Sequence, residues 1–482
     1  MDAATFPEDV VQVLREEGLL NPRDPETPVV RFAHPAELQE EIDFSLGQDG
    51  CTDEKLLSLV RHTIQRSVDT GHPHFYNQLY GGTDPYGLAG AWVSEACNTN
   101  QYTFEVAPTF SLAEHAVLQR VLELFGFPNG DGIFAPGGSM SNMYGLVLAR
   151  YRLYPDVKTD GLAGLPPLVV FTSEDAHYST LKGAHWLGIG TRNVVKVKTD
   201  AAGCMDPKHL EQCIIKATRE KKKPFAVVAT AGTTVLGSFD PLNPLADICQ
   251  KHGLWLHVDA CWGGSLILSR KYASVLEGID RCDSVAWNPH KMLGAPLQCS
   301  MFLVKHEGLL HRCNSASATY LFQQDKFYDV TYDSGDKSVQ CGRKVDAYKL
   351  WVMWRKRGDE GLTRLVDNAV DCAQYFAKII SERPGFELVL PEFQCTNICF
   401  WFLPASMREQ TRDEAWWDKL SKVAPLIKER MVLQGAVMLG YQPMAHRGLV
   451  NFFRMVTTCQ PPPSRTQMDF VIEEIERLGD DL

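Results

Sequence analysis

The chain has 482 residues, 45% of them hydrophobic and 22% charged, with a formal net charge of -11. This length exceeds one typical domain, so two or three folded units are expected from an ordinary soluble composition. The acidic balance argues against nucleic-acid binding, and no run reaches the roughly 18 apolar residues of a membrane span. The 14 cysteines lack metal-ligand spacing, and the first residues do not resemble a signal peptide. We therefore expect a cytoplasmic protein with reduced thiols, no metal site, and no membrane or nucleic-acid partner.

Residues 1 to about 70 indicate helices broken by a proline-rich link at 21–28. Apolar residues between Leu56 and Val68 have helical spacing, but they are too few to form a core of their own. We expect residues 1–88 to form a helical segment that packs on a larger unit, or on a second subunit. The stretch 72–82 is rich in turn formers, aromatics and amides, which suits either a binding loop or an aromatic turn of the core.

A helix is predicted from Pro108 to Phe125, with Gly126 as its C-terminal cap. The glycine-rich stretch 132–142 is then expected to open another helix, which runs to Ala149. Glycines before a helix let backbone N–H groups converge on an anion, and the helix dipole favours phosphate. A plain helix start explains the same pattern equally well.

Short apolar runs then alternate with helical stretches, which predicts an α/β fold with a mostly parallel sheet covered on both faces. After about residue 345 the pattern changes to a smaller α+β unit. We therefore divide the chain into residues 1–88, a large domain at 89–345 and a small C-terminal domain at 346–482. The expected strands of the large sheet lie at 167–171, 194–197, 225–229, 254–258, 284–287 and 299–304, and those of the small unit at 386–390, 396–402 and 449–456.

Lys291 stands at the end of one of these runs. The strand Ser284–Trp287 is followed by Asn288-Pro289, and the proline turns the chain away from helix. The carboxyl end of a strand is the usual place for a ligand site in an α/β sheet. A buried lysine is costly as a cation, so its neutral amine would be available to form a Schiff base with a carbonyl. The alternative is an ordinary surface lysine at a strand end.

Other strand ends carry polar residues in similar positions. Asp259 directly follows an apolar run and could be an ion-pair partner, a helix cap or a carboxylate facing a pyridine nitrogen. His177 could stack on a ring, and Thr233 and Thr234 could donate hydroxyls to a phosphate. A lysine, an acid, a phosphate loop and a stacking histidine together describe a site for pyridoxal 5'-phosphate (PLP).

With these residues in place, the chain resembles the PLP-dependent acidic amino acid decarboxylases of the glutamate and cysteine sulfinate decarboxylase family. The resemblance extends from about His72 to Leu482. It implies the fold type I architecture of PLP enzymes and a homodimer whose active sites are shared between subunits. The motifs that carry it are Asn-Pro-His-Lys (288–291), His-Val-Asp-Ala (257–260), Thr-Ala-Gly-Thr-Thr (230–234), Tyr-Leu-Phe-Gln-Gln-Asp-Lys (320–326) and Asn-Phe-Phe-Arg (451–454).

The resemblance also implies roles for individual residues. Lys291 would carry the cofactor as a Schiff base, with Asp259 at the pyridine nitrogen and His177 on the ring. Arg454 would hold the substrate α-carboxylate, and Tyr320, on a mobile loop, would return a proton to Cα after carbon dioxide leaves. The implied cofactor contacts also include Ser139, Met140, Ser141, Thr234, Cys261, Asn288 and His290, and the implied substrate contacts are Gln78, Tyr80, Asn100, Tyr102 and Arg454.

One residue departs from the family pattern. The family has two alanines after the aspartate, whereas this chain has Ala260-Cys261. Cys261 would lie under the ring as a thiol slightly larger than a methyl group and open to oxidation. The favoured interpretation is a small hydrophobic residue that fills the same space, and we assign it no catalytic role.

The preferred acid is predicted from three pocket positions of the family, which correspond to Tyr80, Asn100 and Tyr102. Tyr80 and Tyr102 are typical of cysteine sulfinate decarboxylases, whereas Asn100 is typical of glutamate decarboxylases. The bulk of Tyr80 and the extra hydroxyl of Tyr102 should narrow the pocket and favour shorter acids. We expect cysteine sulfinate first, aspartate second and glutamate third, with overlap because a methylene changes binding by only about 1–3 kcal/mol.

Two other classes share parts of this pattern. An aminotransferase would have the lysine, the aspartate and the phosphate loop, but it would need a keto-acid partner and no Tyr320 loop. A non-catalytic relative could act as a regulatory subunit, although every key position here retains a competent residue. Product analysis distinguishes a decarboxylase from an aminotransferase, and cofactor binding at Lys291 distinguishes it from a non-catalytic relative.

Overall fold

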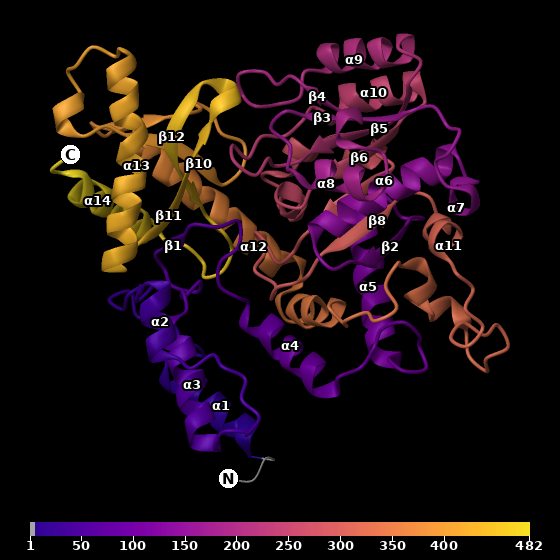
Figure 1. The fold of residues 1–482 in the computed structure, drawn as a ribbon, viewed down its shortest axis with the longest axis horizontal. Helices are drawn as coiled ribbons and strands as arrows, with labels where there is room; N and C mark the ends of the chain where they lie inside the picture. Colours follow the sequence, from indigo (N-terminus) through magenta and orange to yellow (C-terminus); the bar gives the residue numbers. More distant parts are fainter. Residues whose placement is uncertain (1–4) are drawn as a thin grey trace.

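The larger of two β-sheets positions most of the predicted site (Figure 1). The computed structural model describes residues 5–482. The strand order is β2-β8-β7-β6-β5-β3-β4, in which β4, β3, β5, β6 and β7 are parallel neighbours and β8 is antiparallel to both β7 and β2. The strands are β2 (Asp131–Phe134), β3 (Leu168–Ser173), β4 (Val194–Val197), β5 (Lys223–Thr230), β6 (Trp255–Asp259), β7 (Ser284–Trp287) and β8 (Met301–Val304).

Both faces of this sheet are buried, as its continuous apolar runs predict. Along β5, Val227 packs into a cluster with Leu210 and Leu245, whereas its neighbour Val228 packs into a different cluster with Leu146. Successive side chains of a strand point to opposite faces, so helices must cover each side. The covering helices are α9 (Pro207–Arg219) and α10 (Leu242–His252) on one face and α6 (Gly138–Leu153) and α8 (Ser179–Trp186) on the other.

The smaller sheet has the strand order β1-β11-β12-β10-β9 and packs against long helices (Figure 1). Helix α12 (Ala347–Glu382) is kinked at Gly358, whose φ of 61° and ψ of 176° are not helical. The apolar pattern of this stretch predicts two helices, at 347–354 and 362–381, and the break lies between them. The other elements of this unit are β1 (Phe75–Tyr76), β9 (Phe386–Leu388), β10 (Asn397–Phe402), β11 (Met438–Met444), β12 (Leu449–Val456), α13 (Glu414–Gln434) and α14 (Arg465–Gly479).

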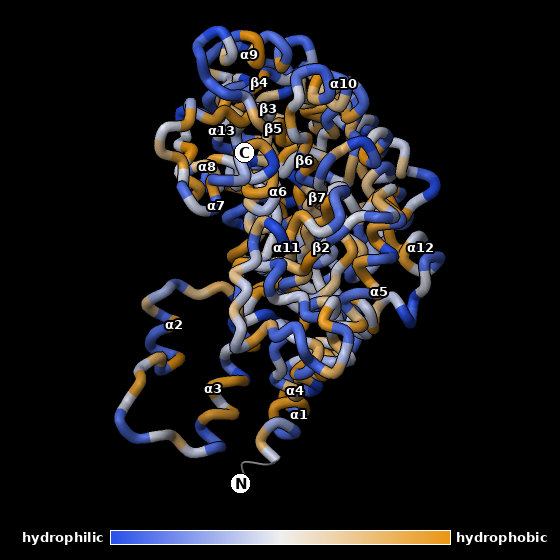
Figure 2. The backbone as a smooth tube through the Cα atoms, turned by 90° about the vertical axis from the view of Figure 1, so that its right-hand side faces the viewer, coloured by the Kyte–Doolittle hydropathy of each residue, from blue (hydrophilic) through white to orange (hydrophobic). Residues whose placement is uncertain are grey.

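The N-terminal helices stand at one end of the molecule, and Figure 2 shows α2 and α3 away from the main body. Strand β1 follows them and pairs in parallel with β11, so residues 75–76 belong to the small sheet. The predicted boundaries at 88 and 345 stay predictions. The remaining helices are α1 (Phe6–Glu16), α2 (Pro35–Glu41), α3 (Asp53–Arg66), α4 (Pro85–Cys97), α5 (Pro108–Leu124), α7 (Val157–Asp160) and α11 (Leu309–Asn314).

Besides the two-residue β1, which lies in the predicted loop 72–82, two strands differ from the sequence prediction. Residues 131–134, expected to lead directly into a helix, form β2 at the edge of the large sheet, and α6 begins only at Gly138. Strand β11 was not predicted at all, because Gly440 and Pro443 interrupt its pattern. Within residues 5–482, no helix combines the length and the apolar character needed to cross a membrane.

Candidate active site

Lys291 lies just beyond the carboxyl end of β7. Its backbone N–H donates to the Asn288 carbonyl over 3.0 Å, which closes the turn that Pro289 introduces. The Asn288 side chain is buried, and its Oδ1 accepts a hydrogen bond of 2.6 Å from Ser300 Oγ. The lysine itself is half-buried. The turn therefore holds a partly accessible amine at the carboxyl end of the sheet, where the sequence predicts a ligand site.

Asp259 is the last residue of β6, the strand next to β7. Its Oδ1 accepts from the Cys261 backbone N–H at 3.1 Å, and its Oδ2 accepts from Asn142 Nδ2 at 2.7 Å. Burial would raise the pKa of Asp259, but the Lys291 charge and the hydrogen bond from Cys261 outweigh it and leave the pKa below its usual value. The site therefore contains a buried carboxylate that stays ionised.

Two histidines flank this pair. His177 is half-buried, and burial lowers its pKa, an effect that Lys291 reinforces and Asp259 opposes. His290 is buried, its Nδ1 lies 2.6 Å from the Cys299 carbonyl oxygen, and burial lowers its pKa to about 4. Both rings are thus favoured in the neutral form at neutral pH.

Helix α6 begins beside these residues, after Gly137 with a φ of 98°. A Cβ on Gly138 would lie 2.6 Å from both Asn288 Nδ2 and Cys261 Sγ, so the backbone approaches the site closely here. Ser139 is exposed at the helix start, whereas the Ser141 hydroxyl is buried and lies 3.0 Å from Ser300 Oγ. Met140 is partly buried and packs its side chain into the hydrophobic cluster under α6.

Cys261 is buried in this corner, and burial, with the nearby Asp259 charge, raises the pKa of its thiol well above the usual value. A thiol that stays protonated is a poor nucleophile. This agrees with our reading of Cys261 as a space-filling residue.

Arg454, on β12, joins the small sheet to the loop after β5. Its Nη1 donates to the Thr234 carbonyl at 2.8 Å and its Nη2 to the Asn77 carbonyl at 3.2 Å. Arg454 is 9% exposed, and its Nε has no hydrogen-bond partner. Arg454 thus offers a fixed cation with an unused donor. The residue that follows Asn77 in the chain, Gln78, is exposed.

The other predicted site residues lie in loops. Asn100 and Tyr102 lie between α4 and α5, where Asn100 Oδ1 accepts from the Arg343 backbone N–H at 2.9 Å and the Tyr102 carbonyl accepts from Gly335 at 2.9 Å. Tyr80 is half-buried in the loop after β1, and Tyr320 is 78% exposed. Among the contacts described for residues 5–482, none joins Tyr320 to Lys291 or Arg454.

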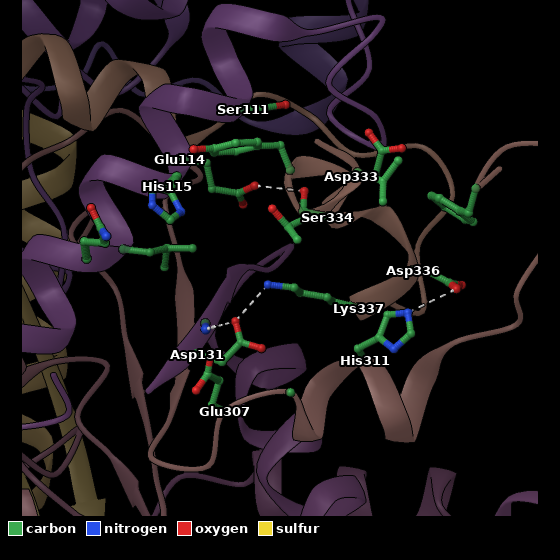
Figure 3. A pocket seen from close by; sticks show the side chains of 18 of the residues that line it. Ser111, Glu114, His115, Asp131, Glu307, His311, Asp333, Ser334, Asp336 and Lys337 are labelled. Carbon is green, nitrogen blue, oxygen red and sulfur yellow. Dashed lines mark hydrogen bonds and ion pairs between the residues drawn. The ribbon is translucent and has the colours of Figure 1, made fainter. Parts of the chain in front are cut away.

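A cavity of about 1120 Å³ lies away from Lys291, between α5, β2, α11 and residues 317–337 (Figure 3). Its acidic residues are largely paired: Asp131 accepts from Lys337 at 3.0 Å, and Asp336 lies 3.7 Å from His311. Glu114 forms a buried ion pair with Arg343. Because Asp131 and Glu114 are already ion-paired with Lys337 and Arg343, the cavity is a weaker candidate for catalysis than the carboxyl end of the sheet at Lys291.

The sequence analysis did not single out Asn142, which donates to Asp259, or Asn77, which fixes Arg454. Asn142 lies in the first turns of α6 among apolar residues, and Asn77 lies in the loop 72–82. A polar residue on the buried face of a predicted helix was the available signal for Asn142. Asn77 uses its backbone carbonyl, for which residue type gives no signal.

Known proteins resemble the chain over nearly its whole length. Acidic amino acid decarboxylase GADL1 of Xenopus tropicalis is 52% identical over 479 residues, covering 99% of this chain and 93% of that protein. Human cysteine sulfinic acid decarboxylase is 52% identical over 461 residues, covering 94% and 92%. The crystal structure of mouse CSAD superposes with a TM-score of 0.95 at 49% identity and covers 99% of both chains. Residues 35–403 match the pyridoxal-dependent decarboxylase conserved domain, and the chain therefore belongs to the pyridoxal-dependent decarboxylase family.

Proposed function

We propose that this decarboxylase removes the α-carboxylate of a short acidic amino acid, cysteine sulfinate first and aspartate second, with glutamate as the runner-up. The observation that carries the proposal is the meeting of Lys291 and the ionised Asp259 at the ends of neighbouring strands. The names of the relatives support an acidic substrate. The corresponding products would be hypotaurine, a precursor of taurine, and β-alanine, with γ-aminobutyrate from glutamate.

The residues around Lys291 fit PLP in three respects. A buried anion is available for the pyridine nitrogen at Asp259, an amine is available at Lys291, and the start of α6 approaches through Gly138 with the exposed Ser139. When bound, PLP supplies an electron sink that weakens the bonds at the substrate Cα. Asp259 would keep a proton on the ring nitrogen, His177 would cover the ring face, and Thr234, Ser139 and the helix start would bind the phosphate.

Arg454 would orient the substrate through its α-carboxylate. A guanidinium matches a carboxylate in shape, and the two backbone carbonyls on Arg454 fix the cation before substrate arrives. Tyr320 would then return the proton to Cα once its loop closes over the site. Loop closure also excludes water, which protects the carbanionic character at Cα.

Borohydride treatment of the purified enzyme tests the central bond. We expect reduction to fix the cofactor covalently on Lys291, with mass spectrometry locating it there and Lys291→Ala remaining unlabelled. Product analysis with cysteine sulfinate should then give carbon dioxide and the amine in equal amounts. A keto-acid product would indicate an aminotransferase, and a protein without bound cofactor would indicate a regulatory subunit.

Steady-state rates on cysteine sulfinate, aspartate and glutamate test the substrate order. We expect kcat/KM to fall in that order, with glutamate last because Tyr80 and Tyr102 would narrow the pocket. The ratios should be moderate, about tenfold to a hundredfold per methylene. A clear preference for glutamate over both shorter acids would reject the order while leaving the decarboxylase assignment intact.

We also propose a homodimer with shared active sites, located in the cytoplasm. The strong exposure of Tyr320 and of Phe327, at 78% and 97%, supports a loop that acts on a partner subunit. The 14 cysteines are all free thiols, which suits a reducing compartment. Light scattering would test the dimer, and cell fractionation would test the location.

A further inference from the structure

Buried hydrogen bonds connect Asp259 through Asn142 and His257 to Ser284 and Trp255. The donor and the acceptor of each bond can be assigned. The indole Nε1–H of Trp255 can only donate, and it lies 2.8 Å from Ser284 Oγ. The serine oxygen therefore accepts this bond and keeps its own proton for another partner. His257 Nδ1 also lies 2.8 Å from this oxygen. A hydroxyl oxygen can accept two bonds, so the tautomer of His257 is decided at the other end, where the ionised Asp259 can only accept. It turns the Asn142 NH₂ toward itself and the Asn142 oxygen toward His257 Nε2, so Nε2 must donate and Nδ1 of the neutral ring accepts the Ser284 proton.

The next steps follow from the tautomer of His257. Its ring is fully buried, and burial lowers its pKa to about 4, so the ring is neutral at neutral pH. With Nδ1 accepting, the single ring proton is on Nε2, which lies 2.9 Å from Asn142 Oδ1. The Asn142 carbonyl oxygen thus faces the histidine. Its NH₂ group is left to donate to Asp259 Oδ2 at 2.7 Å and to Ser179 Oγ at 2.9 Å.

We propose that Asn142 is a positioning residue for Asp259 and that the chain Trp255–Ser284–His257 fixes the orientation of its amide. If the amide were reversed, its carbonyl oxygen would face the carboxylate, and its NH₂ would face the Nε2–H of His257. Both contacts would be repulsive, so the network allows one arrangement only. This inference rests on the proposed role of Asp259 at the ring nitrogen of PLP.

The arrangement leaves Asp259 prepared for that role. One oxygen is held by Asn142 and the other by the Cys261 backbone N–H, so the carboxylate cannot rotate freely. Donors on both oxygens also favour the ionised form. A Cβ on Gly145 would lie 2.6 Å from His257 Nδ1, so the glycine lets α6 pack directly on the histidine ring. Helix α6 would therefore act on the cofactor in two ways, by binding its phosphate at the helix N-terminus and by holding Asp259 through Asn142.

Two variants test the proposal in the holoenzyme. Asn142→Leu removes the donor while keeping the branching at Cγ, and His257→Phe keeps a ring but removes the proton that orients the amide. We expect Asn142→Leu to raise the Kd for PLP and lower kcat by about tenfold or more, since bonds to charged groups are the stronger ones. The KM for the amino acid should change less than threefold. His257→Phe should change the same parameters in the same direction, but less.

A spectroscopic readout separates positioning from stability. The visible absorption of the bound cofactor depends on the protonation of the ring nitrogen, so its spectrum and the pH profile of kcat should shift in both variants. Thr172→Val is the matched control, because it removes a buried hydrogen bond to the Val228 carbonyl on β5 without touching Asp259. It should lower thermal stability and leave the spectrum unchanged.

The outcomes are distinct. If Asn142→Leu does not fold, the nearly isosteric Asn142→Asp replaces it and should shift the pH profile by placing a second carboxylate against Asp259. Wild-type spectra, PLP affinity and kcat in the Asn142 and His257 variants would overturn the inference. Failure of the wild-type protein to bind PLP, or full activity of Asp259→Asn, would instead overturn the proposed function on which it rests.

Discussion

Tyr80 is the side chain on which the proposed preference for short acids depends most. Replacing it by alanine opens the pocket by a whole aromatic ring, so a longer acid gains room that it lacks in the wild type. We expect Tyr80→Ala to raise the ratio of kcat/KM for glutamate to that for cysteine sulfinate by roughly tenfold or more. Parallel rate measurements on the two acids check this.

Tyr86→Ala provides the control for this change. Tyr86 is a tyrosine on α4 with 38% exposure, outside the predicted pocket positions. Its loss should leave the ratio within about twofold, because surface substitutions have small effects. An unchanged ratio in Tyr80→Ala would mean that the discrimination lies elsewhere, with Asn100 and Tyr102 as the next positions to exchange.

Single residues at strand ends were predictable because their positions follow from the sheet. Lys291 and Asp259 each end an apolar run, and parallel neighbouring strands bring such ends together. Asn142 was missed because its function depends on facing Asp259, 117 residues away. Which face of a helix packs on which strand is a tertiary property, and it cannot be predicted from local residue spacing.

The start of α6 depends on the absence of a side chain at Gly138. A methyl group there would lie 2.6 Å from Asn288 Nδ2 and Cys261 Sγ, so either the helix or these side chains must move. Overpacking of this kind costs about 1–3 kcal/mol. We expect Gly138→Ala to weaken PLP binding by about tenfold or more, as a titration of the apoenzyme with PLP would show.

Gly50→Ala is the matched control for this substitution. A Cβ on Gly50 would meet nothing within 4 Å, and the residue lies before α3, in the N-terminal part of the chain. Its PLP affinity should equal that of the wild type. Equal affinities for Gly138→Ala and wild type would show that the helix start can shift without loss of the phosphate contacts.

Secondary structure was predicted best where burial is continuous. The run Ser284–Trp287 was placed to the residue, and β3, β5 and β6 to within about two residues, because strands buried on both faces are apolar throughout. Strand β11 was not predicted because a proline, Pro443, interrupts its pattern. The strand tolerates this proline because it lies at a break in register between Gln442 and Met444, where no ladder hydrogen bond is needed. Strand β2 was not predicted because it is short and contains Gly132, a residue type that is common in turns.

The whole molecule should lose stability on mild acidification because it buries neutral histidines. Burial lowers the pKa of His74 and of His257 to about 4, below the usual value near 6.5. Between these pH values the unfolded chain takes up protons that the folded chain excludes, so stability falls as pH drops from about 6.5 to about 4. Each ring contributes on the order of 3 kcal/mol over the full interval.

Urea unfolding between pH 7.5 and 4.5 checks this, with His74→Phe as the variant. His74 stacks on Phe470 at 4.0 Å between ring centroids, so phenylalanine should keep the packing and remove the titrating group. The loss of stability with falling pH should be smaller in the variant than in the wild type. His185→Phe changes an exposed histidine and should keep the wild-type slope. Identical slopes in all three proteins would rule out His74 as a contributor.

The proposed sharing of active sites between subunits can be tested by mixing two inactive chains. Lys291→Ala lacks the cofactor lysine and Tyr320→Phe lacks the proton donor, so each homodimer should be inactive. In a mixed dimer, Lys291 of one chain and Tyr320 of the other would make one intact site if the loop reaches across the interface. An equal mixture, reassembled or co-expressed, should then regain roughly a quarter of wild-type activity. If Tyr320 serves the Lys291 of its own chain, every site in the mixture lacks one of the two residues and no activity returns.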